Sequence, residues 1–156
     1  MQAQMALDAG MMIAAYTRDP RCFKEGIEAF GPLRNKLQFF ALDIETDPGI
    51  RVTRAMLDGV KALDVRPVIY TGSGMWPTIM EPSDDFSDVP LWDTQTASFA
   101  YGDWHVDHLW PKPTEYGGWN TPSTMRIGVQ QQFEYSLFGV RVDLNSFDID
   151  FLKPDL

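Results

Sequence analysis

Two acidic residues stand close together at the end of an apolar run. The run covers residues 39–42, the acids are Asp43 and Glu45, and Pro48 and Gly49 break the segment. In a strand, side chains two positions apart point to the same face, with Cα atoms about 6.6 Å apart. Two carboxyl groups at this spacing repel one another, so that one keeps its proton near neutral pH. Glycosidic bond cleavage uses such a pair, although two acids on an exposed strand end are the alternative interpretation.

Polar and aromatic residues also lie at the carboxyl ends of the other predicted strands. Apolar runs over 11–16, 39–45, 66–71 and 89–93 alternate with helical patterns over 20–30 and 53–63. The alternation predicts an α/β fold with a parallel sheet, either doubly wound or closed into a (β/α) barrel. The run over 11–16 contains no charged residue, which predicts a strand buried on both faces. Both folds collect functional groups at the carboxyl ends of strands, here Tyr16, Glu45, Tyr70, Thr71, Trp92 and Asp93.

The length and the net charge of the chain argue against several classes of function. The chain has 156 residues, 44% of them hydrophobic, which suits one domain over 1–156. Its 22 acidic and 13 basic residues give a net charge of −9, which argues against nucleic-acid binding and against a basic membrane-surface helix. No run has the length of a membrane span, and the N-terminus lacks the cationic start of a signal peptide. The sequence therefore leaves the compartment unknown, and Cys22 has no second cysteine for an internal disulfide.

The segment over about 94–124 reads as an aromatic-rich insertion. Its large rings predict either a wall that stacks on sugars, a lid over exposed sheet, or a contact between copies. His105, Asp107 and His108 form a short cluster without a distant third ligand, so we expect no metal site. The rings in question are Tyr101, Trp104, Trp110, Tyr116 and Trp119.

Four segments, taken in order, resemble glycoside hydrolase family 25. They are ALDIET (41–46), RPVIYTGSGMW (66–76), PLWDTQ (90–95) and VDLNSF (142–147). The resemblance covers roughly residues 5–150. The family comprises lysozymes that cleave the β-1,4 bond between N-acetylmuramic acid and N-acetylglucosamine in peptidoglycan. Its order of motifs is the signal, since a single Asp-x-Glu is common in any sequence.

The resemblance implies roles for individual residues. It implies an irregular (β/α) barrel with Glu45 as the general acid. Asp43 would stabilise the developing positive charge or position the acetamido group of the substrate, and Asp143 would assist. No metal or other cofactor is implied, and the partner would be a peptidoglycan glycan strand, as for a phage endolysin released to the cell wall. The implied sugar-binding residues are Tyr16, Tyr70, Trp92 and Gln130.

The chain also departs from the family pattern. The family opens on a strand with a Gly-x-Asp-x-Ser segment and a second βα unit, and neither matches before Met11. An aromatic-His-Phe motif is replaced here by Tyr16, Thr17 and Arg18. We therefore expect a barrel that lacks about two βα units: a truncated product, a remodelled open barrel, or a sheet completed by a second chain or copy. A non-catalytic glycan-binding or structural module is the alternative function, and an unrelated polysaccharide hydrolase is a third.

Overall fold

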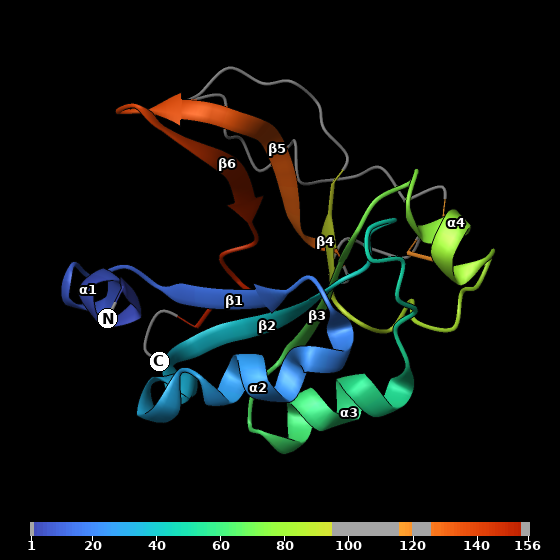
Figure 1. Ribbon diagram of the computed structural model, residues 1–156, viewed down its shortest axis with the longest axis horizontal. Helices are drawn as coiled ribbons and strands as arrows, with labels where there is room; N and C mark the ends of the chain where they lie inside the picture. Colours follow the sequence, from blue (N-terminus) through green and yellow to red (C-terminus); the bar gives the residue numbers. More distant parts are fainter. Residues whose placement is uncertain (1, 95–115, 120–125, 154–156) are drawn as a thin grey trace.

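The computed structural model describes residues 2–94, 116–119 and 126–153 and contains one six-stranded sheet (Figure 1). The strands neighbour one another in chain order, the first five run parallel, and the sixth is antiparallel to the fifth. The sheet curls into a half-barrel, so the predicted mixed α/β architecture and the incomplete barrel agree with the structure. The strands are β1 (Ile13–Thr17), β2 (Leu37–Asp43), β3 (Pro67–Thr71), β4 (Leu91–Asp93), β5 (Arg126–Leu137) and β6 (Val140–Phe147).

Helices cover the outer face of the sheet along β1 to β3 (Figure 1). The helix predicted after Thr53 is present, because the Thr53 hydroxyl accepts a hydrogen bond from the Met56 N–H (3.3 Å) and its apolar stripe buries Leu57 and Val60. The helices are α1 (Gln2–Asp8), α2 (Phe23–Glu28), α3 (Arg54–Ala62) and α4 (Trp76–Met80), with 3₁₀ turns η1 (Pro20–Cys22) and η2 (Gly31–Lys36).

Strand β2 is buried along its whole length and separates two apolar clusters. Phe40 and Leu42 pack toward the helices, while Phe39 and Ala41 pack inside the half-barrel. Because side chains alternate along a strand, Asp43 lies on the inner face with Phe39 and Ala41. The last residue of the strand therefore presents a carboxyl group to the interior of the half-barrel.

Strand β1 corrects one prediction. Within the described part of the chain it forms an edge of the sheet and pairs with β2 alone, and of its side chains only that of Ile13 is buried. The apolar composition suggested burial on both faces, but a strand without an outer neighbour keeps one side open. An apolar groove of about 640 Å³ runs beside it, lined in part by Met12, Phe39 and Phe147. The pairing of this edge with a second chain or copy stays a prediction.

A β-hairpin follows the parallel part of the sheet, so one antiparallel strand extends the predicted parallel sheet. Strands β5 and β6 are joined by Phe138 and Gly139, whose φ angles are 50° and 82°. A two-residue hairpin loop favours such a turn because its twist matches that of the strands. The hairpin rises above the rest of the sheet (Figure 1) and forms a wall opposite β1.

Only part of the predicted aromatic insertion is described. Residues 95–115 and 120–125 lie outside the described residues, and with them Trp104, Trp110 and the His105–His108 cluster. Tyr116 and Trp119 are described and buried, and the Trp119 indole N–H donates to the Val89 carbonyl (2.9 Å). These two rings belong to the core rather than to an exposed sugar-stacking wall.

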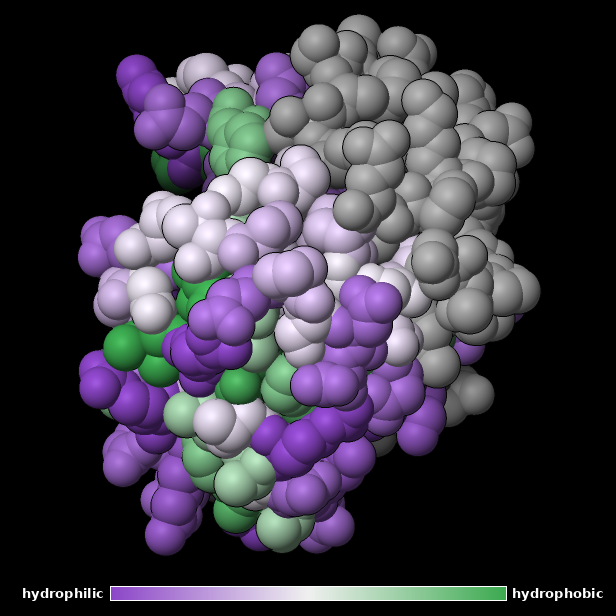
Figure 2. All heavy atoms as spheres, turned by 90° about the vertical axis from the view of Figure 1, so that its right-hand side faces the viewer, coloured by the Kyte–Doolittle hydropathy of each residue, from purple (hydrophilic) through white to green (hydrophobic). Residues whose placement is uncertain are grey.

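The described surface shows no sign of a membrane-spanning helix. Within the described ranges, every helix is too short or too polar to cross a bilayer. On the face that carries α4, hydrophilic side chains surround separate small apolar areas (Figure 2). Among the same residues, three metal-ligating side chains do not gather at any one point.

Candidate active site

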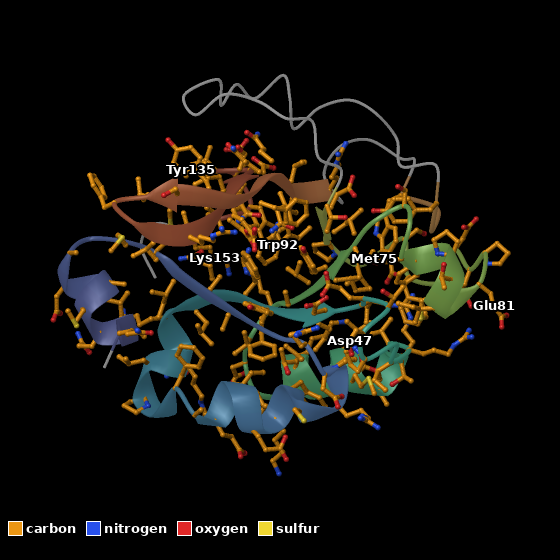
Figure 3. The ribbon with its side chains drawn as sticks, turned by 45° about the horizontal axis from the view of Figure 1, so that its top comes forward. Asp47, Met75, Glu81, Trp92, Tyr135 and Lys153 are labelled. Atoms are coloured by element: carbon orange, nitrogen blue, oxygen red, sulfur yellow. The ribbon has the colours of Figure 1, made fainter. Side chains whose placement is uncertain are left out.

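A cleft of about 460 Å³ lies between the carboxyl ends of the parallel strands and the β5–β6 hairpin. Trp92 lies between the hairpin and the strands below it (Figure 3). All seven residues predicted for the site line this one cleft, and their roles stay predictions. The lining residues are Tyr16, Arg18, Asp43, Glu45, Tyr70, Trp92, Gln130, Phe133, Glu134, Asp143 and Asn145.

The two paired acids occupy different positions at the end of β2. The strand ends at Asp43, two residues earlier than predicted, although the Ile44 N–H still donates to the Tyr70 carbonyl (2.8 Å). Glu45 then enters a turn in which its carbonyl accepts from the Gly49 N–H (3.0 Å). Asp43 is 4% exposed, whereas Glu45 is only half-buried. The buried acid thus belongs to the sheet, and the more open acid belongs to the loop.

The electrostatics of the pair centre on Asp43. The pKa of Asp43 is raised to about 7, chiefly by burial and then by the negative charge of Glu45, while the positive charge of Arg18 lowers it. The Asp43 Oδ1 atom is buried and has no hydrogen-bond partner among the described residues. Asp43 is therefore protonated in part of the molecules near neutral pH, chiefly because it is buried rather than because of its spacing from Glu45. The resemblance instead gives proton donation to Glu45, and that role stays a prediction.

Hydrogen bonds between aromatic and amide side chains fix the positions of several residues that line the cleft. The Tyr70 hydroxyl donates to the Gln130 Oε1, and the Trp92 indole N–H donates to the Asn145 Oδ1 (3.0 Å). The Tyr70 and Trp92 rings meet edge to face, with centroids 4.8 Å apart. Burial, followed by the charges of nearby acids, raises the pKa of Tyr70, so its hydroxyl stays a neutral donor.

Two irregularities in β5 aim the hairpin side chains at the cleft. From Gln132 to Tyr135, β5 has one more residue than the facing stretch of β6, and Glu134 takes a φ of 50°. The Glu134 N–H, displaced from the ladder, donates to the Asp143 Oδ1 (2.8 Å). Bulges of this kind re-orient side chains next to functional sites. Asp143 is exposed and is held by backbone rather than by a buried partner.

Four lining residues were not among the predicted ones. Asn145 lies inside the VDLNSF segment, so that motif already contained a signal for it. Arg18 lies at the departure from the family pattern, where no motif pointed to it. Phe133 and Glu134 reach the cleft through the irregular register of β5, which the sequence does not reveal. By contrast, Trp76 of the RPVIYTGSGMW segment is fully buried against Phe86 and contributes packing.

No protein-family model matches the chain, and no curated protein matches it significantly. A solved structure, that of the CTP1L endolysin, whose activity is regulated by a secondary translation product, is similar with a TM-score of 0.56. The two chains are 16% identical, and the comparison covers 96% of this chain and 51% of the endolysin chain. This chain thus has an endolysin-like fold and spans about half the length of the endolysin.

Proposed function

We propose that this chain is a peptidoglycan hydrolase of the family 25 lysozyme type, which cleaves the β-1,4 bond between N-acetylmuramic acid and N-acetylglucosamine. The observation that carries the proposal is the buried Asp43, whose pKa is raised to about 7, beside Glu45 in a cleft at the strand ends. The order of the four sequence motifs and the endolysin-like fold support it. The proposed partner is a glycan strand of the cell wall.

In the proposed mechanism, Asp43 and Glu45 act as one unit that holds one proton. The proton passes to the glycosidic oxygen as its bond to the anomeric carbon breaks, and the remaining carboxylate stabilises the developing positive charge. Water then adds to the anomeric carbon and returns a proton to the pair. The sharing follows from the raised pKa of Asp43, and two single variants assign the donor.

The walls of the cleft provide the groups that a sugar needs. Tyr16 is 59% exposed and lines the cleft, so its ring is available for stacking. Gln130, fixed by Tyr70, and Asn145, fixed by Trp92, have amide groups for the hydroxyl and acetamido groups of a glycan. We propose that these side chains position the bond over the paired acids.

Release of reducing ends from purified cell wall tests the proposal. Glu45→Gln and Asp43→Asn are each expected to lower the rate by about 100-fold or more, since general acid catalysis contributes about 10²- to 10⁴-fold. The variant with the greater loss at low pH, where both acids are protonated in the natural protein, identifies the donor. New ends that carry N-acetylmuramic acid would identify the bond.

Glu81→Gln is the matched control, because Glu81 is an exposed acid that does not line the cleft and lies beside α4, away from Trp92 (Figure 3). This variant should hydrolyse wall at the natural rate. If the natural protein binds wall but releases no reducing ends between pH 4 and 9, the hydrolase proposal is wrong. The chain would then be a non-catalytic glycan-binding module, a function that its open half-barrel also suits.

A further inference from the structure

The cleft contains one basic side chain among four acidic ones. Of its described lining residues, only Arg18 is a cation, whereas four lining residues are acids. Because the whole chain also has a net charge of −9, an anionic ligand is repelled from most of this surface. A ligand with a carboxylate can therefore enter favourably only where that carboxylate meets Arg18. The position of the arginine would fix the orientation of such a ligand.

The guanidinium of Arg18 keeps donors available. Its Nη2 donates to the Asp47 carbonyl (3.1 Å) and to the Asp47 Oδ2 (3.3 Å). Among the described residues, Nε and Nη1 have no hydrogen-bond partner. The ion pair is exposed, with 61% of the Arg18 side chain accessible, so it contributes little to stability. Nε and Nη1 thus remain for an incoming carboxylate, a group that arginine binds through paired hydrogen bonds.

Arg18 follows shortly after an exposed aromatic residue of the cleft, Tyr16. It comes two residues after Tyr16, directly beyond the end of β1, and both side chains line the cleft. A sugar ring stacked on Tyr16 would bring the groups on its rim toward Arg18. The positive charge of Arg18 also lowers the pKa of Asp43, so the guanidinium lies within electrostatic range of the paired acids.

We infer that Arg18 binds a carboxylate of the glycan and so makes the cleft selective for muramyl sugars over chains of N-acetylglucosamine alone. This inference rests on the proposed function, since it names a feature of the same substrate. The carboxylate has two sources, the D-lactyl group on the sugar itself or the peptide stem attached to it. The two sources share their chemistry and differ in their distance from the ring.

Three variants isolate the charge and the geometry of the side chain. Arg18→Gln removes the charge, and Arg18→Lys keeps the charge but loses the fork of donors. Arg21→Gln is the matched control, because Arg21 is equally accessible at 61%, pairs with Asp19 (2.6 Å) and does not line the cleft. All three are made in protein that also carries Glu45→Gln, so that binding is measured without turnover.

Calorimetric titration with three glycans gives the readout. The first has free lactyl carboxylates, the second has them converted to neutral methylamides, and the third keeps its peptide stems. We expect the protein with intact Arg18 to bind the first glycan about 10- to 100-fold more tightly than the second, the effect of a hydrogen bond to a charged group. Arg18→Gln should abolish this preference, Arg18→Lys should reduce it, and Arg21→Gln should leave it unchanged.

Each outcome has a distinct meaning. The protein with intact Arg18 could bind the third glycan, but not the first, more tightly than the second. If Arg18→Gln abolishes that preference, the bound carboxylate belongs to the peptide stem. Equal weakening of all three glycans by Arg18→Gln, or no weakening, overturns the inference. Reducing-end release by protein with intact Glu45 is measured separately. If the protein hydrolyses wall but shows no preference for a carboxylate, the proposed function stands and this inference is wrong. If it prefers the carboxylate but does not hydrolyse wall, the proposed function is wrong and the binding role of Arg18 stands.

Discussion

Gln38 and Asp43 lie near opposite ends of strand β2, and both polar side chains are almost completely buried, at 3% and 4% exposure. Gln38 is fully engaged: its Nε2 donates to the Lys153 carbonyl (2.8 Å), and its Oε1 accepts from the Lys153 N–H (2.6 Å). Arg66 also donates to the Gln38 carbonyl (2.9 Å). Asp43 leaves its Oδ1 without a partner among the described residues and faces the charge of Glu45.

This difference in hydrogen bonding indicates that the amino end of β2 stabilises the fold, whereas its carboxyl end contributes to the candidate active site. At the amino end of β2, satisfied hydrogen bonds fasten the C-terminal segment to the sheet, and Arg66 stacks on Phe151 (4.1 Å). At the carboxyl end, an unsatisfied oxygen and a neighbouring acid are unfavourable for folding. An arrangement that costs stability and lines a cleft is typical of functional sites. Three predictions test this contrast.

The largest expected effect is a pH dependence of stability that comes from Asp43. Its pKa rises from 3.8 to about 7 on folding, so the unfolded chain loses this proton at lower pH than the folded protein does. The free energy of unfolding should therefore fall by about 4 kcal/mol between pH 4 and pH 8, relative to a protein without this group. Asp43→Asn should remove this fall and be the more stable protein at pH 8.

Urea unfolding at several pH values measures this effect, and the difference between the two proteins isolates the one group. Asp143→Asn, a change at an exposed acid in the same cleft, is the control, and this variant should keep the fall that comes from Asp43. Parallel stability curves for the natural protein and Asp43→Asn would show that the two ends of β2 do not differ in this way.

A smaller loss is expected at the amino end. Gln38→Leu removes two hydrogen bonds between the buried Gln38 side chain and the Lys153 backbone. The free energy of unfolding should drop by about 2 kcal/mol at every pH, since each hydrogen bond contributes about 0.5–1.5 kcal/mol. Hydrolysis per folded molecule should not change, because Gln38 does not line the cleft. A variant that is more stable, or that loses hydrolysis while folded, would contradict the contrast.

The smallest effect concerns a strained residue away from the cleft. Phe138 is 99% exposed at the hairpin tip with a φ of 50°, a conformation that asparagine tolerates better than phenylalanine. Phe138→Asn should raise the free energy of unfolding by about 0.5–1 kcal/mol and leave hydrolysis unchanged. Thermal unfolding and the reducing-end assay measure the two quantities. Lost hydrolysis would instead include the hairpin tip in glycan binding.

The order of apolar and polar residues along the sequence predicted many of the strands and helices. Alternation of apolar residues placed Asp43 at a strand end on the face opposite Leu42, and Thr53 marked the start of α3. The same pattern did not predict the two edges of the sheet, where β1 has one neighbouring strand and β6 runs antiparallel. Neither the number of neighbours nor the direction of a strand is encoded in its own periodicity.

The sequence by itself determined which chemical groups this protein has and their order: two acids two residues apart, aromatic residues at other strand ends, and motifs that resemble a lysozyme family. Only the tertiary structure decided how those groups differ. Asp43 has a raised pKa because the half-barrel buries it. Arg18 enters the cleft because β1 ends beside the acids, and Asp143 is oriented by an irregular register in the hairpin. Burial and proximity come from distant segments, so no local pattern contains them.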